Sequence, residues 1–305
     1  MARKAHFWLL LSVLLVSASG ASCPQFLYMN RPAGPRVLPA TASMNDVIQV
    51  VNANTSRVQS IYTNNANISV PLMLPLRAQI AIERPRRLHL WADTMMTGPE
   101  VDLGSNDEIF WFWAKRSPQP AVFFCRHDQF ANSAARNLLP VEPEWLIEAF
   151  GLTTFDPNVN HRGPTAAGGR LRIDTPLQTA SGPMSKVTFV DESQGWVLAQ
   201  HLYDAQNRLV VSALSSNHWR DPETGIVLPT RIELQTPASA TASQFSLRLE
   251  MRDLQVNKPQ NPQFWALPSY AGYQPLNLAD PNLRLAPPPA AANGGTAAAR
   301  GQIRQ

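Results

Sequence analysis

Residues 101–116 of the chain read VDLGSNDEIFWFWAKR, and this stretch decides the fold class. The small polar run at residues 105–108 has the composition of a tight turn. It leads into four consecutive large apolar side chains, Phe110, Trp111, Phe112 and Trp113. Successive residues of a strand point to opposite faces, so the two tryptophans share one face and the two phenylalanines share the other. An antiparallel strand that is apolar on both faces belongs in the middle of a sheet whose two sides are both covered.

The surrounding sequence shows the period of two that is typical of strands, in short runs broken by Pro and Gly. The clearest run is residues 244–252, where Phe245, Leu247, Leu249 and Met251 alternate with polar or charged residues. We expect about eleven strands, at residues 68–70, 78–83, 87–92, 108–115, 121–127, 170–174, 186–191, 196–203, 209–215, 230–235 and 244–252.

Two segments have the spacing of helices. Residues 43–61 carry an apolar stripe that begins at Val47, and Ser43 is placed to cap that helix. Pro143 suits the first turn of a second helix over residues 143–152. The expected fold class is therefore α+β: a strongly curved antiparallel sheet, an open half-barrel of about eleven strands, with helices covering its concave face.

The N-terminus has the order of a secretory signal peptide. Arg3 and Lys4 precede an apolar run at residues 6–16 and a stretch of small residues at 17–22. The apolar run is shorter than the ~20 residues that span a bilayer. We expect a signal peptide at 1–22, a Pro-rich tether at 23–41, one folded domain at 42–275 and a disordered Pro/Ala-rich tail at 276–305. The expected location is the periplasmic side of the bacterial cell envelope.

Cys23 follows Gly20-Ala21-Ser22, and small residues before a cysteine are typical of the bacterial lipobox. Gly20 stands where Leu is usual, so the match is imperfect. Two uses of Cys23 stay open. It could carry a lipid that anchors the protein to the membrane, or it could form a disulfide with Cys125 in an oxidising compartment.

Motifs for catalysis, metals and cofactors are missing from the sequence. It contains no GxSxG, P-loop, GxGxxG, HExxH or CxxC pattern, so we expect no enzyme, no cofactor and no metal site. We interpret Asp107 and Glu108 as part of a solvated hairpin turn. The formal charge is +4, and removal of Arg3 and Lys4 with the signal peptide would leave +2. This small excess, spread along the chain, argues against a nucleic-acid partner.

Four stretches carry a family resemblance: IERPRRL at residues 82–88, residues 102–113, RHDQF at 126–130 and VEPEWLIEAFGL at 141–152. On these residues the chain resembles the LolA/LolB-like superfamily of periplasmic lipoprotein carriers and receptors, in particular a planctomycete-type lipoprotein branch. The resemblance spans about residues 43–270. It implies a curved antiparallel half-barrel closed by helices, with acyl chains or lipoproteins bound in an apolar cavity.

Aromatic residues of the strands are the candidate ligand contacts, chosen by their apolar character. They are Trp91, Phe110, Trp111, Phe112, Trp113 and Phe123. Which face of the sheet lines a cavity stays open at this point. The alternative function is a structural or envelope-sensing interaction module. Its core would be filled by its own side chains, for example with Phe264 and Trp265 packed over the aromatic strand.

Overall fold

The computed structural model describes residues 35–284, except residues 72, 139–140, 180–181 and 239–243. The predicted signal peptide, Cys23 and most of the predicted tether and tail lie outside the described residues. The chain divides into two compact units, Met1–Arg36 and Val37–Gln305, and every element below belongs to the second. Lipidation of Cys23 therefore stays a prediction. Cys125 is buried and forms no disulfide with any described residue.

The second unit is built mainly of strands. They are β1 (Ser60–Ser69), β2 (Leu76–Glu83), β3 (Arg87–Thr94), β4 (Gly98–Ser105), β5 (Ile109–Ala114), β6 (Ala121–Arg126), β7 (Arg162–Ala166), β8 (Arg170–Thr179), β9 (Gly182–Asp191), β10 (Val197–Tyr203), β11 (Leu209–Arg220), β12 (Val227–Thr236), β13 (Phe245–Arg252), β14 (Gln255–Val256) and β15 (Gln274–Asn277). The helices are α2 (Met44–Thr55), η1 (His127–Asn132), α3 (Ala135–Leu138), α4 (Pro143–Ile147), the π-helix η2 (Glu148–Leu152) and η3 (Pro262–Trp265).

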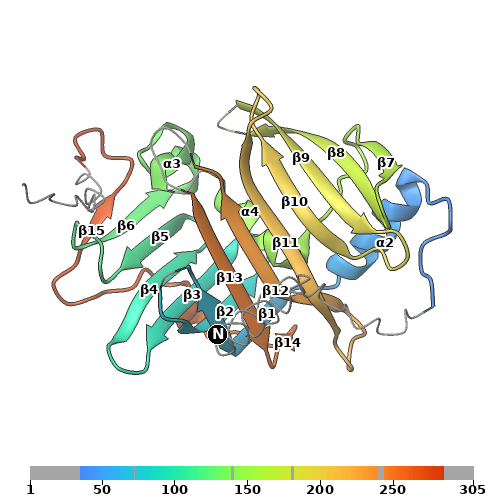
Figure 1. The fold of residues 1–305 in the computed structure, drawn as a ribbon. Helices are drawn as coiled ribbons and strands as arrows, with labels where there is room; N and C mark the ends of the chain where they lie inside the picture. The colour runs from blue at the N-terminus through green and yellow to red at the C-terminus, as the bar shows by residue number, and fades with distance from the viewer. Residues whose placement is uncertain (1–34, 72, 139–140, 180–181, 239–243, 285–305) are drawn as a thin grey trace, which may run out of the picture. The chain divides into compact units, whose positions relative to one another are not determined.

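All fifteen strands join one sheet, in the order β15-β6-β5-β4-β3-β2-β1-β13-β12-β11-β10-β9-β8-β7, and β14 also pairs with β1. Neighbouring strands are antiparallel, except that β15 runs parallel to β6. Figure 1 shows this sheet passing without a break from β15 and β6 to β7. The edge strands β15 and β7 do not pair with each other, so the curved sheet is open. This agrees with the predicted curved antiparallel sheet.

The sheet has two faces, which we call the inner and the outer face. On the inner face, Ile232 of β12 lies opposite Leu249 of β13, and both pack in the main core with Ile147 and Phe150 of α4 and η2. In each strand, the residues directly before and after these two point to the outer face, because side chains alternate along a strand. The inner face therefore packs against α2, α4 and η2, while η3 contacts Tyr62 and His89 on the outer face.

Both predicted helices are confirmed. Ser43 caps α2 with a capping box, in which its side chain and that of Asp46 each accept a hydrogen bond from the other's backbone N–H. Val47 of α2 packs with Ile173 of β8 in a second core. Pro143 occupies the first turn of α4, as expected. The first helix ends at Thr55, earlier than predicted, because the chain turns into β1 at Ser60.

The sheet has fifteen strands where about eleven were expected. The four additional strands are β4, β7, β14 and β15. Three of them, β4, β7 and β15, were not predicted because each contains a proline, namely Pro99, Pro164 and Pro275. The fourth, β14, has only two residues. Proline is tolerated at sheet edges and at strand starts, since no ladder hydrogen bond is lost there. β7 and β15 are the two edge strands, and Pro99 is the second residue of β4.

The folded unit extends beyond the predicted domain of residues 42–275 at both ends. Leu38 is buried against α2, and the backbone N–H of Val37 donates to the carbonyl of Ser193 at 2.8 Å. At the other end β15 runs to Asn277, and Leu278 is buried. Within residues 35–284, no described helix has both the length and the apolar character needed to cross a bilayer.

Candidate functional site

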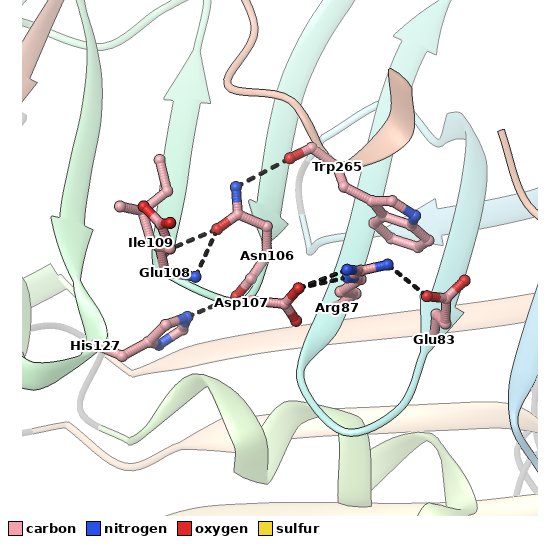
Figure 2. Close-up of polar contacts among 8 residues, drawn as sticks. All are labelled: Glu83, Arg87, Asn106, Asp107, Glu108, Ile109, His127 and Trp265. Carbon is pink, nitrogen blue, oxygen red and sulfur yellow. Dashed lines mark hydrogen bonds and ion pairs between the residues drawn. The ribbon is translucent and has the colours of Figure 1, made fainter. Parts of the chain in front are cut away.

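The acidic stretch before β5 is a turn, as predicted. The side-chain Oδ1 of Asn106 accepts hydrogen bonds from the backbone N–H groups of Glu108 and Ile109, both at 2.9 Å. Its Nδ2 donates to the carbonyl of Trp265 at 3.0 Å, so the turn also holds the start of the C-terminal segment (Figure 2). His127 directs Nε2 to the Asn106 carbonyl at 2.9 Å.

Asp107 takes part in a surface ion-pair network. Arg87 donates from Nε to its Oδ2 at 3.1 Å, and the other side of the guanidinium reaches Glu83 Oε1 at 2.6 Å (Figure 2). The Arg87 guanidinium holds the pKa of the Asp107 carboxyl below its ordinary value. A general acid or base needs a pKa near the working pH, and this shift moves Asp107 away from it. Asp107 therefore ties the turn to β3, and Glu108 contributes its backbone N–H to the turn.

The phenylalanine face of β5 is the inner face, and the chain covers it. Phe110 packs against Phe130 of η1, with ring centroids 5.6 Å apart at an angle of 75°. Phe110 and Phe123 belong to one buried cluster with Leu278, which follows β15. Phe112 packs against the same cluster. This side of the strand is therefore filled by η1, α3 and the residues after β15.

The tryptophan face of β5 is the outer face, and the C-terminal segment covers it. The ring of Tyr270 stacks on Trp113 with centroids 3.8 Å apart and planes 9° apart. Trp111 has no exposed surface, and it packs in a cluster with Trp113 and Val122 that also includes Leu267. Both faces of the aromatic strand are thus covered by other parts of the same chain.

A buried carboxylate, Asp102 of β4, fixes this cover to the sheet. Its Oδ1 accepts from Trp111 Nε1 at 2.8 Å and lies 3.1 Å from His89 Nε2. Its Oδ2 accepts from the Tyr270 hydroxyl at 2.8 Å. Burial and the Asp102 carboxylate raise the pKa of Tyr270 above its ordinary value, so the hydroxyl keeps its proton and donates. Sequence reasoning missed Asp102, because its partner Tyr270 is 168 residues away.

The six aromatic residues predicted as ligand contacts are divided between the two faces. Phe110, Phe112 and Phe123 lie inside, while Trp91, Trp111 and Trp113 lie outside, since Trp91 pairs with Asp102 across β3 and β4. A single cavity cannot be lined by both sets. Two pockets among the described residues, of about 200 and 470 Å³, are lined by other residues.

Four large apolar side chains are exposed at two turns of the sheet, and we call them the apolar tip. They are Met73, Leu74, Met95 and Met96, with exposed fractions of 58%, 82%, 82% and 95%. The first pair lies between β1 and β2 and the second between β3 and β4. Arg77 at the start of β2 pairs with Asp93 near the end of β3, so the turn before β2 and the turn after β3 lie at the same end of adjacent strands.

Charged side chains surround the apolar tip. Lys115 donates from Nζ to the carbonyl of Thr97 at 2.6 Å, directly at the β3–β4 turn. Arg116 pairs with Glu100 at 3.2 Å, and Arg77 pairs with Asp93 at 2.8 Å. Exposed apolar side chains with a rim of charged residues are typical of protein or membrane contact sites. The sequence carries a signal for this tip, because the pair Met95-Met96 stands between Thr94 and Thr97-Gly98, where turn residues are expected.

The chain was compared with known proteins. No protein-family model matches it, and no curated protein matches it. Among solved structures it is similar to a putative outer membrane lipoprotein-sorting protein domain from Vibrio parahaemolyticus, at 10% identity and a TM-score of 0.49, covering 72% of this chain and 95% of that one. It is also similar to the LolA superfamily protein NE2245 from Nitrosomonas europaea, at 11% identity and a TM-score of 0.45, covering 74% and 98%.

A third similar structure is a DUF1329 family protein from Desulfovibrio piger, at 12% identity and a TM-score of 0.47, covering 74% of this chain and 98% of that one. Two of these structures are named as a lipoprotein-sorting domain and a LolA superfamily protein, the class that the sequence resembles. At TM-scores of 0.45–0.49 they assign no ligand to this chain. The planctomycete-type branch stays a prediction.

Proposed function

We propose that the protein is an exported envelope protein that binds lipid acyl chains or lipoproteins, and that the apolar tip is the surface that contacts them. One observation carries the proposal. Met73, Leu74, Met95 and Met96 are exposed together at one end of the sheet, while five of the six aromatic residues of the sequence prediction are packed against the chain itself. No catalytic residue is part of the proposal, in keeping with the sequence prediction that the chain is not an enzyme.

The size of the tip sets the strength of such binding. Full burial of one Met or Leu side chain contributes about 1.5–3 kcal/mol. Four of them give a gross contribution of roughly 6–12 kcal/mol, from which the cost of association must be subtracted. The remainder fits reversible contact with a lipid surface or an acyl chain, because even a whole myristoyl chain gives only marginal membrane binding.

A lipid on Cys23 would supply the second membrane signal. Stable attachment generally takes two signals, such as two acyl chains or one chain with a further contact. We propose that Cys23 carries the anchor and that the tip makes the weaker, reversible contact. Labelling of cells with a radioactive fatty acid tests the anchor, since the wild-type chain should take up label and the Cys23→Ala chain should not. Equal labelling of both chains would contradict it.

Co-sedimentation with vesicles tests the tip. The mature chain without its anchor, carrying Cys23→Ala, should bind vesicles of phosphatidylethanolamine and phosphatidylglycerol. Met95→Ser with Met96→Ser should weaken this binding about tenfold or more, because two apolar side chains lose their contact. Val37→Ser with Leu214→Ser is the matched control, since both residues are exposed and lie away from the tip. Equal loss in the control, or none in the tip variant, would contradict the proposal.

The packing of the aromatic strand favours a second candidate function, an envelope-sensing or structural interaction module with a self-filled core. Trp111 and Phe110 are both buried by segments of the same chain, as this alternative predicts. In that case the apolar tip would contact another protein. The vesicle experiment separates the two candidates, because a protein-binding module retains its tip residues yet does not sediment with lipid.

A further inference from the structure

The C-terminal end of α2 and the neighbouring ends of β11 and β12 line a pocket that the proposed function does not use. We call it the α2 pocket, and its volume is about 200 Å³. Its walls come from the second half of α2, the β9–β10 turn and strands β11 and β12. The apolar part of the lining includes Val50, Val51, Trp196, Val227 and Pro229.

Two arginines stand at the rim of the α2 pocket. The guanidinium of Arg57 donates to the carbonyl of Thr224, and that of Arg220 donates to the carbonyl of the next residue, Gly225, at 2.9 Å. Arg57, Arg220 and Gly225 all line the pocket. Adjacent carbonyls of one turn therefore hold the two positive charges close to each other.

Neither arginine is paired with a carboxylate of the described residues. The nearest acidic side chains of the turn are otherwise engaged: Asp221 accepts from the backbone N–H of Thr224 at 3.0 Å, and Glu223 pairs with Lys258 at 3.2 Å. The pocket lining contains no Asp or Glu. A guanidinium has five N–H donors, so one carbonyl partner leaves most of them available to an anion.

The neutral polar groups of the lining are already satisfied. Asn54 uses both ends of its amide on the backbone of Val227, donating at 2.7 Å and accepting at 2.8 Å. The hydroxyl of Thr55 donates to the carbonyl of Val51 at 3.0 Å. His218 stacks on Trp196 with centroids 4.9 Å apart, and its Nε2 lies 3.1 Å from the Val197 carbonyl. Compared with Asn54 and Thr55, the two guanidiniums keep more donors for a ligand.

We propose that the α2 pocket binds a small carboxylate with an apolar body, held by Arg57 and Arg220 at the rim and by the valine and Trp196 walls inside. Paired N–H donors of arginine match the geometry of a carboxylate. At ~30 Å³ for a water-sized group, the volume holds roughly seven such groups. A six-carbon carboxylate therefore fits the volume of the pocket.

The probes follow from this chemistry. Hexanoate carries both features, 1-hexanol keeps the apolar body without the charge, and acetate keeps the charge without the body. In a ligand-observed NMR titration of the mature chain, hexanoate should bind with a Kd about tenfold or more below those of 1-hexanol and acetate. Equal binding of 1-hexanol, or of acetate, would overturn the proposal, because one of the two recognised features would then be irrelevant.

Variants localise the binding. Arg57→Gln with Arg220→Gln should raise the Kd for hexanoate about tenfold or more, since charge-assisted hydrogen bonds are lost. Ala53→Phe, at an exposed position of α2 that lines the pocket, should abolish binding by filling it. Arg136→Gln is the matched control, because Arg136 is exposed and also donates to a backbone carbonyl, that of Ala131. Unchanged binding in the first two variants, or equal loss in the control, would place the ligand elsewhere and overturn the proposal.

Discussion

The substitution Gly104→Ala tests whether the aromatic strand is a packed wall or the side of a hollow cavity. Gly104 of β4 lies opposite Trp111 of β5. A Cβ atom at residue 104 would lie 2.0 Å from Cζ2 and 2.2 Å from Cε2 of the Trp111 ring. Carbon atoms in contact stay about 3.5–4.0 Å apart, so the ring or the backbone must move by about 1.5 Å.

The cost of this movement depends on what surrounds the indole. Trp111 is completely buried, and its Nε1 donates to the buried Asp102 at 2.8 Å. Overpacking of a filled core costs typically 1–3 kcal/mol and occasionally more, and the closeness of these contacts puts Gly104→Ala at about 3 kcal/mol. For a domain of this size, 1 kcal/mol lowers the melting temperature by about 2–4 °C, so the expected decrease is about 6–12 °C.

Thermal and urea unfolding of the purified chain provide the measurement, and a double-mutant cycle isolates the cause. Trp111→Leu removes the ring that Cβ would strike, so Gly104→Ala should cost less than about 1 kcal/mol in that background. If a hollow cavity adjoined Trp111, the ring would slide into it. The alanine variant would then melt within about 2 °C of the wild-type chain. That result would refute the packed-wall interpretation and restore the aromatic strand as a cavity wall.

Three further predictions concern buried polar groups. Lys186 pairs with Glu148 at 2.6 Å. In urea titrations, Lys186→Met should lower the free energy of unfolding by about 2 kcal/mol, because Glu148 loses its partner. The double variant Lys186→Met with Glu148→Met should lower it by less, because no unpaired charge remains. Burial lowers the pKa of His218 in the folded chain below 6.5, so the unfolded chain takes up the proton at a higher pH than the folded chain does. The free energy of unfolding should therefore fall as the pH drops below 6.5, and this slope should be smaller in His218→Gln. Tyr270→Phe leaves Asp102 without one of its donors, and it should cost about 1–3 kcal/mol and expose the C-terminal segment to limited proteolysis.

Local signals in the sequence predicted those parts of the fold that depend on neighbouring residues. Ser43 and Asp46 are three positions apart, and they form the capping box of α2. Residues 105–108 were recognisable as a turn because the hydrogen bonds that close it join Asn106 to its near neighbours Glu108 and Ile109. Strand β4 was missed for a non-local reason. Gly98, Pro99 and Gly104 weaken its strand signal, yet Gly104 is there because the Trp111 ring packs onto its backbone.

The candidate site was harder to predict, because its contacts join distant segments. Asp102 is 9 residues from Trp111 but 168 residues from Tyr270, and no short motif records that pair. Arg57 and Arg220 show the same difficulty, since the carbonyl partner of Arg57 is 167 residues along the chain. Met95 and Met96 were open to prediction, as apolar residues in a sequence of turn formers, and their exposure is what a turn at that position implies.

An apolar run such as Phe110 to Trp113 requires a cover on both faces, but it does not say what the cover is. A ligand and a segment of the same chain satisfy the hydrophobic requirement equally well. Here residues 264–273 and 276–283 follow the last long strands, and they supply the cover from the chain itself. Residues that bind a partner must instead stay uncovered in the free protein. Met73, Leu74, Met95 and Met96 meet that condition, which is why we propose lipid contact at the tip of the sheet and not at its aromatic strand.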